Sequence, residues 1–358
     1  MSPILTRYVM RLYLGAVALV AASVLLVFLV IDFGDRLKLY VGHSFAEVAE
    51  LYVCKLAVTL GQLMPAAMLL AAGIALTTLK RRGELDAMRS IGISPAALVA
   101  PMAACAVLLA GGLVAFDELV AGPAGARVDR LMLERFGIWG DYRYYYGTQA
   151  WLRHGPSIFR VSRVAGKVLE GVTVFRLGEG FALSERVDAD TMQPRAGGGF
   201  ELKNARIRDY AHEPHLVVQE REGTRFNQTD ADAFAIRPGR PEQMSTAELF
   251  EQERLRAAAG LPTIRLRLAR HGRYSYPLLG AVGALLAAGL ALRRNRNAVL
   301  TVALVEGLAV SAAMWGVLVV GRALALSERL PPIAAAWGPV IALGLAGLVL
   351  LRRMERAS

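Results

Sequence analysis

Hydrophobic residues along the chain are gathered into long stretches that are separated by short charged segments. No charged residue occurs from Leu56 to Leu79, and none occurs from Ser90 to Phe116. Each stretch exceeds the roughly 20 apolar residues that a helix needs to cross the hydrocarbon core of a bilayer. The pattern therefore predicts membrane-spanning helices.

The same pattern predicts six such helices, in two groups of three. The expected boundaries are residues 13–31, 56–79 and 96–116, and then, after a long polar region, 274–292, 298–320 and 333–351. We accordingly predict transmembrane parts at residues 1–120 and 274–358, with an inserted domain at 121–273.

The inserted region follows a different period. Apolar and polar residues alternate in four segments, at 157–164, 172–177, 200–207 and 216–219. Period-two runs separated by Gly, Pro and Asp are typical of short antiparallel strands. The predicted architecture is an all-β jelly-roll-like domain, whose inner face would carry Phe159, Val161, Val172, Val174 and Leu202. A helix that begins near Ser245 then leads back to the membrane.

Charge predicts how the spans are oriented. Basic residues gather at four places that all lie on one side of a six-span protein. These are Arg7 and Arg11; Lys80, Arg81, Arg82 and Arg89; Arg293, Arg294 and Arg296; and Arg352, Arg353 and Arg356. Because short cytoplasmic loops carry an excess of Lys and Arg, both termini are predicted to be cytoplasmic and the inserted domain extracytoplasmic.

Composition narrows the function classes. The chain has 358 residues, of which 55% are hydrophobic, and a formal net charge of +11. Much of this charge flanks the spans and no nucleic-acid recognition motif is visible, so no nucleic-acid partner is expected. A phosphate-binding P-loop and a nucleophile elbow are also absent from the sequence. No His or Cys accompanies Cys54 or Cys105 at the spacing of metal ligands. From these absent motifs we expect neither an enzyme nor a bound metal or cofactor.

A short charged run between the second and third spans is the first candidate site. Residues 80–95 are too tightly joined to both spans to be a free tail, and Gly83 and Gly92 bracket a short helix. Glu84 could pair with a basic groove on a cytoplasmic partner. The alternative is a solvated loop whose basic residues only reflect the excess of Lys and Arg in cytoplasmic loops.

Basic residues at the outer ends of the spans form the second candidate site. They are Arg36 and Lys38 after the first span, Arg127 and Arg130 after the third, and Arg322 and Arg329 after the fifth. They could bind the phosphates of an anionic lipid. The alternative is pairing with neighbouring acids such as Asp32, Asp35, Asp129 and Glu328. We favour lipid binding for Arg36 and Lys38.

Glu306 lies inside the fifth predicted span. An intramembrane carboxylate is costly and usually faces protein or water. It could line a polar cavity or relay protons, but a single acid without a second one nearby favours a local hydrogen-bonding role.

Several short motifs occur in order along the chain. They are Arg7-Tyr8, Leu63-Met64-Pro65, Arg82-Gly83-Glu84-Leu85 with Met88-Arg89 and Gly92, Trp151-Leu152-Arg153, Leu169-Glu170-Gly171-Val172, and Leu330-Pro331-Pro332 followed by Ala335-Ala336-Trp337-Gly338-Pro339. Together with the layout of the spans, these motifs resemble the LptF/LptG family of lipopolysaccharide export permeases. The resemblance covers nearly the whole chain. Two departures are Val340, where the family often has Asn, and Glu306.

The resemblance implies an inner-membrane permease that passes lipopolysaccharide to a periplasmic jelly-roll bridge. Its implied partners are a cytoplasmic LptB-like ABC ATPase dimer, a second six-span permease and an LptC-like bitopic protein. The ATPase would act on Glu84, Arg81, Arg82, Leu85, Met88 and Arg89. The lipid would contact Arg36, Lys38, Arg127, Arg130 and Arg322. The alternatives are a membrane-tethered sensor and an ion-coupled transporter.

Overall fold

The structure is a computed structural model of the whole chain, and it forms two compact units. It describes residues 2–136, 150–154, 157–165, 168–194, 200–210, 217–221, 224–226, 240–258, 262–293 and 300–356. The first unit comprises Met1–Phe136, Pro241–Thr246 and Ile264–Ser358, and the second comprises Gly137–Arg240 and Ala247–Thr263. The first unit thus includes parts of the 121–273 region that the sequence assigned to the inserted domain.

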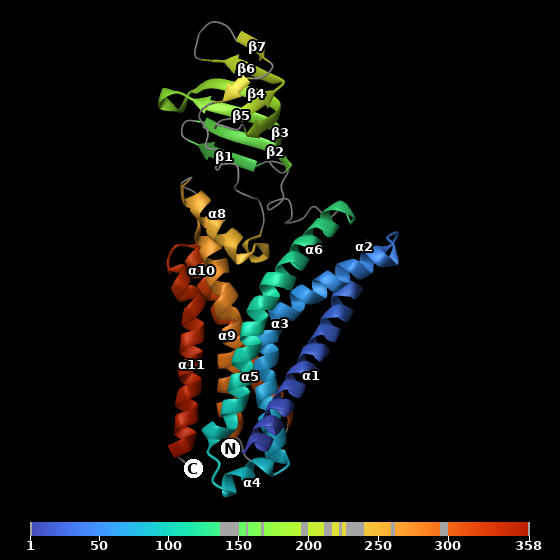
Figure 1. Cartoon of the computed structure of the whole chain (residues 1–358), viewed down its shortest axis with the longest axis vertical. Helices are drawn as coiled ribbons and strands as arrows, with labels where there is room; N and C mark the ends of the chain where they lie inside the picture. The colour runs from blue at the N-terminus through green and yellow to red at the C-terminus, as the bar shows by residue number, and fades with distance from the viewer. Residues whose placement is uncertain are drawn as a thin grey trace. The chain divides into compact units, whose positions relative to one another are not determined.

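The first unit is a helical bundle (Figure 1). Its helices are α1 (Pro3–Asp35), α2 (Leu37–Tyr40), α3 (Phe45–Arg81), α4 (Glu84–Ser90), α5 (Pro95–Phe116), the π-helical turn η1 (Asp117–Ala121), α6 (Gly122–Glu134), α9 (Ile264–Arg293), α10 (Leu300–Leu326) and α11 (Pro332–Arg356). Six helical segments in the described part of the chain are long and apolar enough to span a membrane. This confirms the six predicted spans.

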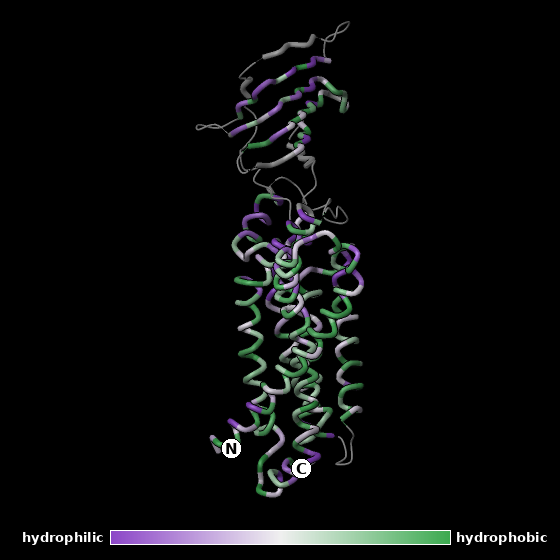
Figure 2. Tube along the Cα trace, turned by 90° about the vertical axis from the view of Figure 1, so that its right-hand side faces the viewer, coloured by the Kyte–Doolittle hydropathy of each residue, from purple (hydrophilic) through white to green (hydrophobic). Residues whose placement is uncertain are grey.

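Helix α3 begins well before its apolar stretch because its polar first turn is capped. The hydroxyl of Ser44 accepts from the backbone N–H of Glu47, and the Glu47 carboxylate accepts from the N–H of Ser44. This capping box satisfies two backbone donors and starts α3 well before Leu56. Figure 2 shows how hydropathy is distributed: hydrophobic residues run along the bundle, and hydrophilic ones gather at its two ends.

Helix α9 is the central helix of the bundle and packs against α3, α5, α10 and α11. Its close approach to α3 depends on Gly280, because a Cβ atom there would lie 2.7 Å from the Cα of Pro65. Small residues allow membrane helices to pack this closely. Both chain termini lie at the end of the bundle that carries α4 (Figure 1), which we call the α4 end.

The second unit contains an antiparallel sheet, which confirms the predicted fold class. Its strands are β1 (Ala150–His154), β2 (Ser157–Ala165), β3 (Val168–Leu177), β4 (Leu183–Pro194), β5 (Phe200–Lys203), β6 (Ala205–Asp209), β7 (Val217–Arg221) and β8 (Thr224–Phe226). Helix α8 (Thr246–Ala258) follows the sheet in the chain and confirms the helix predicted near Ser245. Leu216, which the sequence placed in a strand, is outside the described residues.

The strands form a meander in which β5 and β6 continue each other along β4. Lys203 pairs with Thr191 and Arg206 with Asp188, so the register is the same on both sides of Asn204. Asn204 interrupts the strand with a φ of 52°, and its side-chain amide donates to Asp190 over 2.9 Å. Asn tolerates this left-handed conformation better than most residues.

One face of the sheet holds the hydrophobic core of this unit. The predicted inward residues are all buried in it, namely Phe159, Val161, Val172, Val174 and Leu202. Strand β4 was not predicted from the sequence. It contains Ala, Asp and Glu, which are depleted in strands, yet Val187 and Met192 are buried in the same core.

Candidate functional site

The predicted short helix between the second and third spans is present as α4. Gly83 precedes it with a φ of 74°, a conformation that strains residues with a Cβ atom, and Gly92 follows it with a φ of 85°. The Ser94 hydroxyl accepts from the N–H of Ala97 over 3.2 Å and so caps α5. Two sharp turns therefore join α4 to α3 and α5 without a flexible linker.

The residues predicted to contact an ATPase, in α4 and just before it, divide into a buried and an exposed set. Leu85 and Met88 are buried in the core of the bundle. They fix α4 to the spans and offer no surface to a partner. Arg81 and Arg82 are exposed, while Arg89 is half-buried. The charged residues thus form the outward surface of this segment.

Glu84 has a partner that sequence reasoning missed. Its carboxylate accepts a hydrogen bond of 2.7 Å from the hydroxyl of Tyr8 on α1 and lies 3.8 Å from Arg82. The two residues are 76 positions apart in the chain. Both belong to motifs noted in the sequence, Arg7-Tyr8 and Arg82-Gly83-Glu84-Leu85, and the contact links the start of α1 to α4.

Lys80 lies inside the bundle, although the sequence counted it among loop charges. It is 9% exposed, and its Nζ donates to the carbonyl oxygen of Leu292 over 3.1 Å. A cation at the carboxyl end of a helix satisfies free carbonyl groups and the helix dipole. Lys80 thereby ties the end of α3 to the end of α9, next to α4.

At the opposite end of the bundle, three of the five predicted lipid contacts have acidic partners. Arg36 lies 3.1 Å from Asp32, and Arg127 lies 2.7 Å from Glu50. Arg322 forms an ion pair with Glu242. Lys38 and Arg130 are exposed, and neither has an ion pair among the described residues. Arg36 thus pairs with the neighbouring Asp32, as the pairing alternative had it, whereas Arg127 and Arg322 pair with acids that are distant in the chain.

Asp32 is the centre of a hydrogen-bonded group between α1 and α3, here called the Asp32 cluster. Its Oδ1 accepts from Arg36, while its Oδ2 accepts from Lys55 over 2.6 Å and from the Tyr52 hydroxyl over 2.9 Å. The Tyr52 and Tyr40 hydroxyls are hydrogen-bonded to each other over 2.9 Å. One carboxylate thus contacts two cations.

Aromatic rings enclose one side of this cluster. The ring centre of Phe33 lies 5.6 Å from those of both Tyr40 and Tyr52, and Phe136 approaches Tyr40 edge-on at 5.8 Å. Burial among these rings raises the pKa of the Tyr40 hydroxyl. The hydroxyl therefore remains protonated and available for hydrogen bonding.

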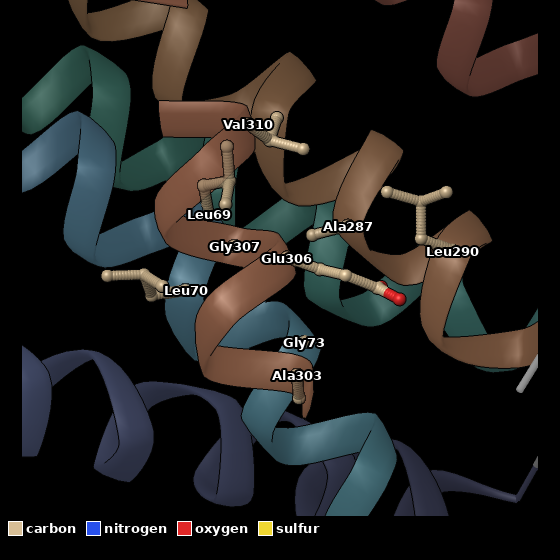
Figure 3. A pocket seen from close by; sticks show the side chains of 9 residues that line it. All are labelled: Leu69, Leu70, Gly73, Ala287, Leu290, Ala303, Glu306, Gly307 and Val310. Atoms are coloured by element: carbon tan, nitrogen blue, oxygen red, sulfur yellow. The ribbon is translucent and has the colours of Figure 1, made fainter. Parts of the chain in front are cut away.

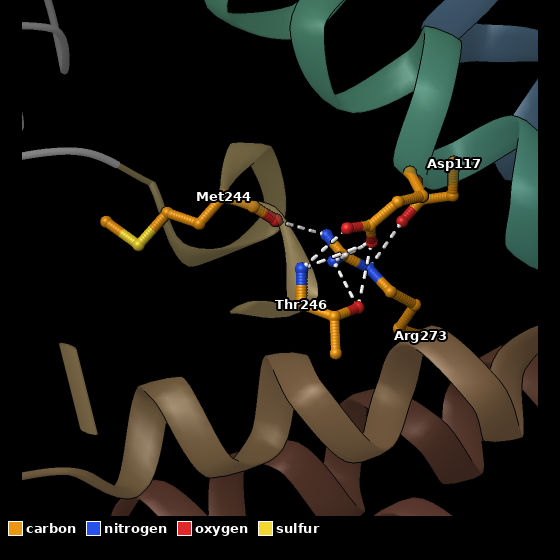
Figure 4. Close-up of polar contacts among 5 residues, drawn as sticks. Asp117, Met244, Thr246 and Arg273 are labelled. Atoms are coloured by element: carbon orange, nitrogen blue, oxygen red, sulfur yellow. Dashed lines mark hydrogen bonds and ion pairs between the residues drawn. The ribbon is translucent and has the colours of Figure 1, made fainter. Parts of the chain in front are cut away.

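A second ionic group, the Arg273 cluster, lies where α5 continues into η1 (Figure 4). The Nε of Arg273 donates to Asp117 over 2.9 Å, and its Nη1 donates to Glu118 over 2.7 Å and to Thr246 over 3.1 Å. Its Nη2 donates to the carbonyl oxygen of Met244. All three guanidinium nitrogens are therefore hydrogen-bonded, and the side chain is only 3% exposed.

The Arg273 cluster also anchors the segment Pro241–Thr246, which precedes α8. This segment contacts residues from four helical elements near the same end of the bundle. The contacts are Glu242 with Arg322 of α10, Gln243 with Asp129 of α6, Met244 with Arg273 of α9, and Thr246 with Glu118 of η1. The local sequence around Arg273 gives no sign of these partners, because Asp117 and Glu118 lie 156 and 155 residues away in the chain.

Comparison with known proteins decides the family. Residues 7–353 match the family described as lipopolysaccharide export system permease LptF/LptG. The chain belongs to the LptF/LptG family. A search of curated proteins finds no match. The resemblance seen in the sequence is thus confirmed, and the sensor and ion-coupled transporter alternatives are set aside.

As an LptF/LptG permease, the protein is a transmembrane subunit of the lipopolysaccharide export system, and the ATPase of that system is a separate protein. The described residues of this permease contain no group of three or more His, Cys, Asp and Glu side chains that could hold a metal ion.

Glu306 of the permease points into a small pocket between α3, α9 and α10 (Figure 3). The other lining residues are Leu69, Leu70, Gly73, Ala287, Leu290, Ala303, Gly307 and Val310. The pocket leaves about 10 Å³ for the centre of a water molecule, which is near the lower limit for holding one. It is too small for an acyl chain, and Glu306 is the sole titratable residue among these described lining residues.

Proposed function

We propose that this LptF/LptG permease resides in the inner membrane with its β-sheet unit in the periplasm. The permease would pass lipopolysaccharide from the inner membrane to a periplasmic jelly-roll bridge. Its partners would be a cytoplasmic LptB-like ABC ATPase dimer, a second six-span permease and an LptC-like bitopic protein. The observation that carries this proposal is the rigid attachment of α4 to the spans.

The charge distribution supports the proposed orientation. Arg7 and Arg11 lie near the start of α1, Arg81 and Arg82 lie at the end of α3, and Arg352 and Arg353 lie near the end of α11. These residues lie at the α4 end, which the positive-inside rule assigns to the cytoplasm. Arg294 and Arg296 are outside the described residues.

The contacts of α4 support a role in ATPase coupling. Buried Leu85 and Met88 hold α4 on the bundle, and Tyr8 holds Glu84 from α1. A push on the exposed charges of α4 would therefore move α1, α3 and α5 together. Arg81, Arg82 and Arg89 would meet the ATPase directly, with Glu84 pairing to a basic residue of that partner.

The surfaces of α1 and α10 support a second permease chain. The most apolar stretches of these helices are 22% and 17% buried, respectively, whereas that of α9 is 67% buried. Large exposed side chains such as Leu26 on α1 and Trp315 on α10 suit a partner helix or lipid acyl chains. A cavity between two such subunits would open sideways to the membrane.

Basic residues at the outer end would then bind the phosphates of lipopolysaccharide. Lys38 and Arg130 are exposed and available. Arg36, Arg127 and Arg322 are also partly exposed but must exchange an acidic partner for the lipid. Glu50 and Glu242 are exposed enough for water to replace the arginine, whereas the shielded Asp32 would depend on Lys55 and Tyr52.

Glu84→Ala in the assembled complex tests the proposal. We expect the variant to insert normally but to lose ATPase association, because truncating one partner of a desolvated ion pair costs about 2–5 kcal/mol of binding. Asp86→Ala, an exposed acid on the same helix, is the matched control. Full ATPase association and full lipid extraction by Glu84→Ala would contradict the coupling role.

A further inference from the structure

Two cations share one carboxylate in the Asp32 cluster, and they differ in exposure. The Arg36 side chain is 43% exposed and that of Lys55 is 10% exposed, against 14% for Asp32. Arg36 contacts Oδ1, whereas Lys55 and Tyr52 contact Oδ2. If Arg36 turned away, Asp32 would keep a buried cation and a hydroxyl donor.

The surrounding charges do not alter this balance. On α3, Glu47 pairs with His43 and Arg135, and Glu50 pairs with Arg127. Asp35 and Lys38, beside Arg36 in the chain, are exposed and of opposite sign. The Asp32 cluster therefore carries one excess positive charge. Arg36 is its most exposed charged member.

The two ion pairs also differ in strength. The Arg36–Asp32 pair is an exposed i,i+4 pair of the kind that contributes little stability. The Lys55–Asp32 pair is shielded from water, so Lys55 without Asp32 would be an uncompensated buried charge. Arg36 can leave without that penalty, and Lys55 cannot.

We propose that Asp32 and Lys55 act as a charge-exchange device for Arg36. Asp32 holds Arg36 at the surface until a phosphate group of the lipid arrives, and Lys55, with Tyr52, keeps Asp32 neutralised once Arg36 has moved to that phosphate. Lys55 is thus a positioning residue that acts through Arg36. The inference rests on the proposed role of Arg36 in lipid binding.

The device predicts effects of opposite sign at its two buried charges. Asp32→Asn removes the competitor for Arg36, so the affinity for lipid should rise. Lys55→Met leaves Asp32 with Arg36 as its sole cation, so Arg36 is retained and the affinity should fall. The double variant should bind more tightly than Lys55→Met alone, and Lys55→Arg should stay near the wild type.

The experiment measures the Kd of fluorescent lipopolysaccharide for the full permease complex in nanodiscs. We expect Lys55→Met to weaken binding about tenfold, the change that 1.4 kcal/mol produces, and Asp32→Asn to tighten it. Competition with inorganic phosphate and with phosphatidylglycerol distinguishes a lipid-borne phosphate from a free one, and only the lipid-borne phosphate fits the device. Melting temperatures are recorded in parallel.

Arg36→Gln separates the two levels of the proposal. An unchanged Kd for Arg36→Gln would refute its role in lipid binding. If Arg36→Gln weakens binding but Asp32→Asn fails to tighten it, lipid binding by Arg36 stands and charge exchange is refuted. Parallel losses of affinity and melting temperature in Asp32→Asn and Lys55→Met would assign the cluster a structural role and overturn the inference.

Discussion

The Asp32 and Arg273 clusters lie at the same end of the helical bundle and have opposite compositions. In the Asp32 cluster one carboxylate contacts two cations, Arg36 and Lys55. In the Arg273 cluster one cation contacts two carboxylates, Asp117 and Glu118. The first therefore has a spare cation and the second a spare anion.

The difference in burial gives the two clusters different roles. The Arg273 side chain is 3% exposed, and each of its guanidinium nitrogens donates a hydrogen bond within the chain. An arginine that makes four hydrogen bonds within the chain and is almost fully buried is not accessible to a ligand, so it acts structurally. Arg36 is partly exposed, and Lys55 can neutralise Asp32 in its place, so Arg36 can contact a ligand.

The largest expected effect comes from removing the buried cation. Arg273→Gln leaves two carboxylates facing each other, and breaking such a pair costs about 3–5 kcal/mol of unfolding free energy. Arg273→Lys keeps the charge but not the planar fork, so we expect an intermediate loss. Denaturant unfolding of the detergent-solubilised protein measures both.

Arg36→Gln is the matched control at the other cluster. An exposed ion pair contributes about 0–1 kcal/mol, so this variant should unfold nearly as the wild type does. Equal destabilisation by Arg36→Gln and Arg273→Gln would remove the distinction between a fixed and an exchangeable cluster.

The second prediction concerns the packing of α9, the helix that carries Arg273. Gly280→Ala places a Cβ atom 2.7 Å from the Cα of Pro65, and overpacking of this kind costs about 1–3 kcal/mol. Gly272 lies on the same helix, and a Cβ atom added there would have nothing within 4 Å. Gly272→Ala should be neutral or stabilising, by up to about 1 kcal/mol, in the same unfolding assay.

The smallest effect on stability is expected at the α4 end. Tyr8→Phe removes an exposed hydrogen bond to Glu84, for which a loss of about 0.5 kcal/mol is expected. If α1 positions Glu84 for its partner, the same variant lowers lipid-coupled ATP hydrolysis by the complex while its stability hardly changes. Unaltered coupling would show that Glu84 acts without help from α1.

The sequence predicted the elements whose signals are local. Long apolar stretches marked six spans because a bilayer core demands about 20 predominantly apolar residues. Alternation marked four strand segments, and Gly83 and Gly92 marked the ends of α4 because both turns need a left-handed residue. Strand β4 has few of the residue types favoured in strands, and its neighbours on both sides stabilise it in the sheet.

The sequence alone therefore determined the family, the spans and the place of the candidate segments. Only the tertiary structure decided which charges meet, since Tyr8 contacts Glu84 across 76 residues and Arg273 contacts Asp117 across 156. It also turned Leu85 and Met88 inward and buried Lys80 at the end of α9. A local pattern records the polarity of a residue, but its partner depends on how distant helices pack.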